Sequence, residues 1–311
     1  MKAVLPAFAR ALLENELPDD LEVTWFKMPE EATAAIPHAE IAWVDQQSGP
    51  VAGAIAAKGE RLKWLFTLYA GLDPFPLDLL GQRGTILTNG TGINAPAVAD
   101  YAMLGVLAAA KRFDEVVRLA DARQWTTTPP GTIELDGSHA LIVGFGTIGR
   151  MIGNRLKACG VNVTGVTRSG GDEILTPDQW RTRLGDYDWV ILAAPSTGET
   201  KLMVGADELA AMKRSAWLIN VARGDLIDQE ALVAALEARQ IAGAFLDPTE
   251  PEPLPLLHPL WRTPNTLLSM HLAGRSQAGM YRRAARLFLD NLVAFRTGRP
   301  MRNIVDLGAG Y

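Results

Sequence analysis

Three polar side chains that could bind an anion or move a proton each follow an apolar run of this sequence. They are Arg223, Glu252 and His271. Arginine is always charged and offers a fork of donors to a carboxylate, whereas histidine exchanges a proton near neutral pH. A carboxylate bonded to such a histidine would orient its ring and favour the protonated form. A lone histidine after a strand is more often structural, so these residues matter only if the fold brings them together.

The elements that would position them alternate between short β-rich runs and longer helical patterns, which is typical of parallel α/β proteins. Such sheets bind ligands at the carboxyl ends of their strands. Helical patterns are expected at 150–159, 228–239, 276–296 and in one long stretch from 95 to about 124. The segments 126–137 and 247–261 read as loops, the second because it holds five prolines. We expect strands at 2–5, 21–26, 41–44, 62–67, 86–88, 140–143, 162–166, 189–193, 216–221, 242–246 and 266–269.

Size and composition indicate a globular protein that is long enough to form two domains. The chain has 311 residues, of which 48% are hydrophobic and 21% charged, and a formal charge of −5 that argues against nucleic-acid or anionic-membrane partners. The single cysteine, Cys159, and four scattered histidines predict neither a disulfide nor a metal site. Charged residues interrupt the N-terminal segment before an apolar core of the secretory kind can form. The apolar run 102–110 is too short to span a bilayer. We therefore expect a soluble, cytoplasmic protein.

The segment GFGTIG, residues 144–149, lies between a predicted strand and a predicted helix. In this context G-x-G-x-x-G is the fingerprint of a dinucleotide site. Gly144 would allow a tight turn, Gly146 a close approach to the pyrophosphate, and Gly149 close packing of helix on strand. Thr147 and Ile148 would open the helix whose N-terminus binds the phosphates. The alternative is a glycine-rich turn without a ligand.

The end of the next strand indicates which dinucleotide binds. An NAD site usually has an acidic residue here to hold the ribose 2′-hydroxyl. This chain has Thr167, Arg168 and Ser169 instead, with no carboxylate before Asp172. Arg168 could pair with a 2′-phosphate, to which the two hydroxyls could donate hydrogen bonds. We expect NADP as the cofactor, with NAD possible, unless Arg168 is an ordinary surface arginine.

The segments NVARGDLID, GAFLDPTEPEPLPLLHPLW and SMHLAG resemble those that carry the catalytic arginine, glutamate and histidine of the D-isomer-specific 2-hydroxyacid dehydrogenases. The three residues follow one another in the same order as in that family. Their separations, 29 residues from Arg223 to Glu252 and 19 from Glu252 to His271, agree with it as well. ALIVGFGTIGR and LKWLFTLYAGLD match as well, so the resemblance runs nearly end to end. Two departures are Met270, where many members have proline, and Pro248, where valine is common.

This resemblance implies roles for individual residues. Arg223 would bind the substrate, His271 would bind it and act as the acid in reduction, and Glu252 would orient the imidazole. Asp247 would contact the nicotinamide carboxamide, and Pro195 is a further expected cofactor contact. Arg275 is either a cation near the site or a surface residue, and His258 is expected at the surface or behind the site.

The resemblance also implies the architecture. We expect two doubly wound parallel-sheet domains, with a Rossmann cofactor domain at 96–274 inserted into a flavodoxin-like substrate domain made of 1–95 and 275–311. Ala70 and Gly71 would present backbone amides to the substrate carboxylate in a cleft between the domains. Gly71 could also be an ordinary glycine after a strand. A homodimer is expected, with the 96–124 helix and Trp125 in its interface.

The expected activity is reduction of a small 2-keto acid, of the glyoxylate or hydroxypyruvate kind, to the D-2-hydroxy acid by hydride transfer from NAD(P)H. One alternative is a dinucleotide-sensing corepressor, which would share the fold but usually carries extra interaction segments. Another is a formate or phosphite dehydrogenase, which would still use Arg223 but needs no pocket for a substrate side chain.

Overall fold

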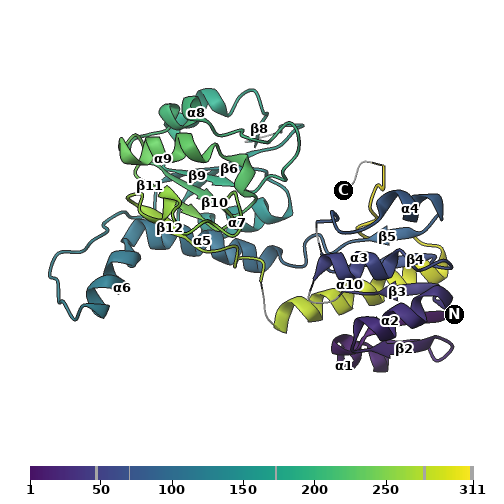
Figure 1. Ribbon diagram of the computed structural model, residues 1–311. Coiled ribbons are helices and arrows are strands. Elements are labelled where there is room, and N and C mark those ends of the chain that lie inside the picture. The colour runs from purple at the N-terminus through teal and green to yellow at the C-terminus, as the bar shows by residue number, and fades with distance from the viewer. Residues whose placement is uncertain (46–47, 70, 172–173, 276–277, 309–311) are drawn as a thin grey trace. The chain divides into compact units, whose positions relative to one another are not determined.

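The computed structural model describes residues 1–45, 48–69, 71–171, 174–275 and 278–308. The chain divides into two compact units, each built on its own parallel sheet (Figure 1). Unit 1 is Met1–Asn94 with Ser276–Tyr311, and unit 2 is Ala95–Arg275. The fold class expected from the sequence, two parallel-sheet α/β domains, is confirmed. No helix in the described part of the chain is long and apolar enough to cross a membrane.

Unit 1 has a five-stranded sheet of order β2-β1-β3-β4-β5 in which every neighbouring pair is parallel. This is the flavodoxin-like order. All five expected strands are present, with slightly different ends. They are β1 (Lys2–Pro6), β2 (Glu22–Phe26), β3 (Ile41–Trp43), β4 (Trp64–Phe66) and β5 (Ile86–Thr88).

Helices cover both faces of this sheet. One face packs on α1 and α10, and the other on α2, α3 and α4. The rings of Trp43, Trp64 and Phe66 meet Phe288 of α10, with Trp64 stacked on Phe288 at a centroid distance of 4.9 Å. These contacts fix the last helix of the chain onto the sheet formed by its first ninety residues. The helices are α1 (Arg10–Leu13), α2 (Pro29–Ala35), α3 (Gly49–Ala56), α4 (Leu77–Gln82) and α10 (Ala278–Thr297), with 3-10 turns η1 (Ala7–Ala9), η2 (Glu14–Glu16) and η3 (Ile36–His38).

Unit 2 has a seven-stranded parallel sheet of order β12-β11-β10-β9-β6-β7-β8. The chain runs outward from β6 through β7 to β8, then returns to β9 on the other side of β6. The strand order therefore reverses between β6 and β9, which is where doubly wound sheets bind ligands. The strands are β6 (His139–Val143), β7 (Asn162–Val166), β8 (Ile174–Leu175), β9 (Trp189–Leu192), β10 (Trp217–Asn220), β11 (Gly243–Leu246) and β12 (Thr266–Leu268).

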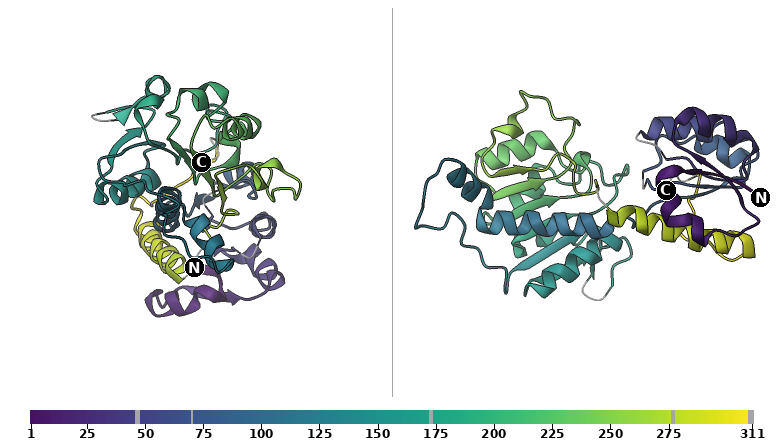
Figure 2. Two further views of the ribbon diagram at one scale, coloured as in Figure 1. Left: turned by 90° about the vertical axis from the view of Figure 1, so that its left-hand side faces the viewer. Right: turned by 90° about the horizontal axis from the view of Figure 1, so that it is seen from below.

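Two helical layers enclose the sheet of unit 2 (Figure 2). On one face α5 and α7 pack on Ala140, Ile142 and their neighbours, and on the other α8, α9 and η4 pack on Leu141 and Val143. Since alternate residues of each strand enter opposite cores, the central strands β9, β10 and β11 are buried at every residue. The helices are α5 (Ala95–Lys111), α6 (Phe113–Asp121), α7 (Thr147–Ala158), α8 (Ala206–Ala211) and α9 (Gln229–Glu237), with 3-10 turns η4 (Arg181–Asp186), η5 (Gly224–Leu226) and η6 (Pro259–Trp261).

The expected single helix from 95 to about 124 is wrong. It is broken at Arg112, whose φ of 47° is left-handed, so α5 ends at Lys111 and α6 starts at Phe113. The Arg112 guanidinium bonds to the side chains of Asp114 and Asn265, at 3.2 and 2.9 Å. These contacts hold the break in place. The short strand β8 was also not expected. The segment 126–137 is a loop as predicted, and so is 247–261 except for the 3-10 turn η6 at its end.

Gly144 should be essential to the stability of unit 2. Its φ is +95°, and a Cβ on it would lie 2.4 Å from the backbone nitrogen of Ala194. We expect Gly144→Ala to lower the free energy of unfolding of unit 2 by about 2–3 kcal/mol, because both the left-handed backbone and the clash oppose it. Urea unfolding followed by tryptophan fluorescence measures this. Gly146→Ala is the matched control, since a Cβ there meets no atom within 4 Å. Equal stability of the two variants would contradict this explanation.

Candidate active site

The glycine loop after β6 is shaped by close backbone approaches. Gly144 lies against Ala194 at the end of β9, and a Cβ on Gly149 would lie 2.3 Å from the carbonyl oxygen of Gly144. Both glycines are therefore required by the packing of the protein itself. Gly146 is different, because a Cβ on it would meet nothing within 4 Å. Its small size leaves room on the outside of the loop, where the pyrophosphate of a dinucleotide would lie.

The N-terminus of α7 faces the same loop. The helix starts at Thr147, with Ile148 and Gly149 in its first turn, and no side chain caps it. The first amides of a helix have no intrahelical acceptor and carry partial positive charge, so they bind phosphate oxygens well. The open face at Gly146 and the uncapped helix end together fit a dinucleotide.

The end of β7 carries the residues that would meet the ribose. Thr167 is partly buried, and its amide donates to the carbonyl oxygen of Leu175 at 3.1 Å. Arg168 and Ser169 are exposed. Within the described residues, which leave out Asp172 and Glu173, no acidic partner is recorded for the Arg168 guanidinium.

Arg223 lies in the loop after β10, and a buried amide side chain shapes that loop. Asn220 is fully buried; its Nδ2 donates to the carbonyl oxygen of Arg223 at 2.8 Å, and its Oδ1 accepts from the amide of Ala222 at 3.0 Å. One side chain therefore fixes the backbone on both sides of the arginine. The Arg223 guanidinium is exposed and donates to the carbonyl oxygen of Ala222 at 2.7 Å.

The next residue, Gly224, brings this loop against the one that carries Glu252. A Cβ on Gly224 would lie 2.2 Å from the carbonyl carbon of Thr249 and 2.7 Å from the nitrogen of Glu250. Only glycine allows this approach. The side chain of Gln229 also donates to the carbonyl oxygen of Glu250, at 2.7 Å. The loops after β10 and β11 thus pack together at the carboxyl edge of the sheet.

Glu252 and His271 are in direct contact. The Oε2 of Glu252 lies 2.8 Å from the Nδ1 of His271, and both side chains are 40% exposed. The other carboxylate oxygen accepts from the amide of Thr249 at 3.3 Å, which ties the glutamate to its own loop. The contact leaves Nε2, the other ring nitrogen, to exchange a proton with a ligand.

Asp247 holds the loop in which His271 lies. Its side chain is 2% exposed and accepts hydrogen bonds from the hydroxyl of Ser269 at 2.7 Å, the amide of Leu272 at 2.8 Å and the amide of Ala273 at 3.1 Å. The amide of His271 donates to the backbone oxygen of Asp247 at 2.7 Å. This carboxylate therefore has a positioning role that the sequence did not reveal.

The backbone of this loop is unusual at two successive positions. Met270 and His271 both have a φ of 56°. Proline cannot adopt a positive φ, so a proline at position 270 would not fit this backbone, whereas methionine does.

The structure thus joins Glu252 to His271 and packs the Arg223 loop beside the segment leading to Glu252. Pro195 is exposed just beyond β9, on the same edge of the sheet. Of the residues expected to bind the substrate carboxylate, Gly71 is exposed in unit 1 and Ala70 lies outside the described residues. Asn220 and Ser269 were missed; their only sequence signal was a polar residue at the end of an apolar strand.

Other candidate features do not join the site. The Nδ1 of His258 accepts from the amide of Leu260 at 3.3 Å, which caps η6. No group of three or more histidine, cysteine or acidic side chains placed to hold a metal occurs in the described ranges.

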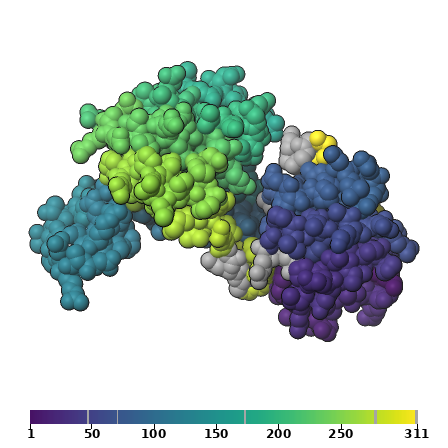
Figure 3. Space-filling model, viewed as in Figure 1, coloured from purple at the N-terminus to yellow at the C-terminus, as the bar shows by residue number. Residues whose placement is uncertain are grey.

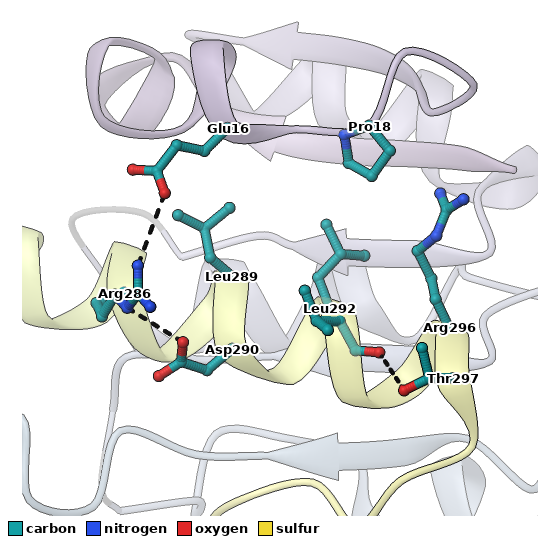
Figure 4. Close-up of a pocket in the computed structure, with 9 residues that line it drawn as sticks. Glu16, Pro18, Arg286, Leu289, Asp290, Leu292, Arg296 and Thr297 are labelled. Atoms are coloured by element: carbon teal, nitrogen blue, oxygen red, sulfur yellow. Dashed lines mark hydrogen bonds and ion pairs between the residues drawn. The ribbon is translucent and has the colours of Figure 1, made fainter.

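A groove of about 320 Å³ in unit 1 lies between η2 and α10 (Figure 4). Its Arg286 and Arg296 pair with acidic side chains, so the groove offers no free cation to an anionic ligand.

Comparison with known proteins places the chain in a family. Residues 103–273 match the NAD-binding domain of the D-isomer specific 2-hydroxyacid dehydrogenases. The chain is 31% identical over 274 residues to a glyoxylate reductase of Korarchaeum cryptofilum, covering 85% of this chain and 82% of that protein. It is 32% identical over 265 residues to glyoxylate/hydroxypyruvate reductase B of Enterobacter agglomerans, covering 82% of each.

A solved structure matches nearly the whole chain. The crystal structure of a D-isomer specific 2-hydroxyacid dehydrogenase family protein from Aeromonas salmonicida is 28% identical, with a TM-score of 0.87 and coverage of 98% of this chain and 99% of that one. The matched segment lies within unit 2, so unit 2 contains the nicotinamide dinucleotide-binding domain of this family. The chain belongs to the D-isomer-specific 2-hydroxyacid dehydrogenase family and is an NAD(P)-dependent dehydrogenase.

Proposed function

We propose that this enzyme reduces a small 2-keto acid, glyoxylate or hydroxypyruvate, to the D-2-hydroxy acid with NADPH. The observation that carries the proposal is the 2.8 Å contact between Glu252 and the Nδ1 of His271. It orients an imidazole as a proton donor at the edge of the sheet that holds the glycine loop. The names of the two reductases that resemble the chain support the choice of substrates.

The chemistry divides among the residues of this edge. The nicotinamide ring supplies the hydride for the carbonyl carbon. His271 gives the proton of Nε2 to the carbonyl oxygen, so that C=O becomes CH–OH and the imidazole is left neutral. Glu252 stabilises the protonated ring before transfer. Arg223 binds the substrate carboxylate and polarises the carbonyl, for which its forked, permanently charged group is suited.

The remaining proposed roles concern binding. Asp247 contacts the nicotinamide carboxamide in addition to holding the histidine loop. The amides of Ala70 and Gly71 receive the substrate carboxylate. We also propose a cytoplasmic location, with which a lone cysteine that can form no internal disulfide is consistent.

Turnover of 2-keto acids tests the proposed activity. We expect NADPH oxidation with glyoxylate and hydroxypyruvate, and a fall in kcat of about 10²–10⁴-fold in His271→Gln, because the proton donor is lost. The dissociation constant of NADPH should not change. His258→Gln is the control, since that histidine only caps η6. Activity near wild type in His271→Gln would refute the assignment of the acid, and turnover of no keto acid would favour the sensor alternative.

Cofactor preference depends on Arg168. It follows β7 and is paired with no acidic group in the described part of the chain. A 2′-phosphate bonded to it would gain a charge-assisted contact that NADH cannot make. We expect Arg168→Asp to lower the ratio of kcat/KM for NADPH to that for NADH by about 10²-fold. Arg214→Asp, an equal change of charge on an exposed arginine before β10, should leave the ratio as it is. An unchanged ratio in Arg168→Asp would rule out an NADP preference set by this residue.

The surface of α6 supports the proposed homodimer. Figure 3 shows α6 and the loop after it projecting from the rest of unit 2. Phe113, Val116 and Val117 are 55%, 38% and 43% exposed, and Trp125 is 95% exposed. A second copy of the chain would bury this apolar surface, since the family is typically dimeric through the cofactor domain.

Sedimentation velocity tests the dimer. We expect wild type to sediment as a dimer and Val117→Asp as a monomer, because a buried unpaired carboxylate opposes association. Val293→Asp in α10, where the valine is 50% exposed, should remain dimeric. A dimer that survives Val117→Asp would place the interface elsewhere.

A further inference from the structure

A buried carboxylate in unit 1 lies beside the segment proposed to bind the substrate. Asp45 follows β3 and is 1% exposed. The neighbouring strand β4 ends at Phe66, and the segment after it leads to Gly71. Because β3 and β4 are parallel neighbours, their carboxyl ends lie at one edge of the sheet. Asp45 is therefore close to the backbone that precedes Gly71.

Three donors surround this carboxylate. It accepts hydrogen bonds from the Nε1 of Trp43 at 2.6 Å, the hydroxyl of Thr67 at 2.7 Å and the amide of Leu68 at 2.5 Å. The amide of Tyr69 donates to the Thr67 hydroxyl at 3.2 Å. Two successive backbone amides, at 68 and 69, are thus aimed at Asp45, one directly and one through Thr67. Fixing these peptide planes fixes the direction in which the chain enters the Gly71 segment.

Other contacts hold the two ends of this segment. A Cβ on Gly90 would lie 1.9 Å from the carbonyl oxygen of Leu68, and the amide of Gly90 donates to the carbonyl oxygen of Tyr69 at 3.0 Å. Beyond Gly71, a Cβ on Gly53 of α3 would lie 1.8 Å from the carbonyl oxygen of Pro74. No hydrogen bond is recorded for the amide of Gly71 within the described residues. The segment is anchored on both sides, and Gly71 is exposed between the anchors.

The cost of burying Asp45 argues against a purely structural role. Burial raises the pKa of Asp45 to about 6, from an ordinary value near 4. The unfolded chain therefore ionises first, and the folded state loses stability as pH rises from about 4 to about 6. No cation pairs with Asp45 in the described part of unit 1. A neutral residue at this position would avoid that loss, whereas a carboxylate can accept from all three donors at once.

We infer that Asp45 is a positioning residue for substrate binding, which aims the backbone before Gly71 so that the amide of Gly71 receives the substrate carboxylate. The inference rests on the proposed function, because it takes Gly71 as part of the substrate site. Amides that are already oriented bind an anion without an ordering cost, so the effect should fall on substrate affinity rather than on cofactor binding.

Kinetics of Asp45 variants test the inference. We expect Asp45→Ala to raise KM for glyoxylate about 10-fold or more, with a smaller change in kcat and an unchanged dissociation constant for NADPH. Asp45→Asn keeps one acceptor oxygen and should recover part of the loss. Thr85→Val is the matched control; Thr85 is 2% exposed and its hydroxyl donates to Leu62 at 2.9 Å, away from this segment. It should lower the melting temperature and leave KM unchanged. A KM in Asp45→Ala within twofold of wild type would overturn the inference.

Hydrogen–deuterium exchange separates this inference from the proposed function. In Asp45→Ala the amides of Leu68 and Tyr69, which are hydrogen-bonded in the wild type, should exchange at least 10-fold faster, while those of β1 and β3 keep their rates. If wild type reduced no keto acid, the proposed function would fail, and exchange would still report whether Asp45 orders this segment. Unchanged exchange at these amides would refute the positioning role whatever the substrate.

Discussion

A buried carboxylate at the end of β11 determines where the imidazole of His271 can lie. Asp247 takes hydrogen bonds from a hydroxyl and two amides of the loop after β12, and its backbone oxygen takes one from the amide of His271 itself. The loop is thereby fixed in a conformation with two successive positive φ values. Such a backbone is costly for residues other than glycine, so it persists only where surrounding contacts hold it. With the loop held in this way, the single hydrogen bond between Glu252 and the Nδ1 of His271 sets the plane of the imidazole.

The two units use the same arrangement. In each, an aspartate just beyond one strand accepts from a hydroxyl and from at least one backbone amide that follows the neighbouring strand. The pairs are Asp247 with Ser269 in unit 2 and Asp45 with Thr67 in unit 1. A parallel sheet favours this, because the carboxyl ends of adjacent strands lie side by side. The result is a set of hydrogen bonds that holds the backbone after each strand, and a binding or catalytic backbone requires such support.

Local patterns in the sequence were enough to predict much of this. All eleven expected strands are present, because apolar runs and the breakers between them are local signals. The glycine motif was equally clear, since its context of strand and helix is contained in about thirty residues. The pairing of Glu252 with His271 was expected only from resemblance to a family, and the structure places the two side chains in contact.

What could not be predicted depends on contacts between distant segments. The break at Arg112 is held by Asn265, 153 residues away. The two hydrogen bonds of Asn220 and the loop-holding role of Asp247 need the folded backbone before they can be recognised. A polar residue after an apolar strand is the same signal whether it binds a ligand, positions a loop or caps a turn.

Transfer of deuterium from NADPH labelled at C4 of the nicotinamide tests the central claim most directly. With each of the two C4-labelled forms in turn and hydroxypyruvate as substrate, product glycerate would be analysed by NMR and by its configuration. The account predicts that one form alone delivers deuterium to C2 and that the product is D-glycerate. Glycerate without the label from either form, or of the L configuration, would contradict it.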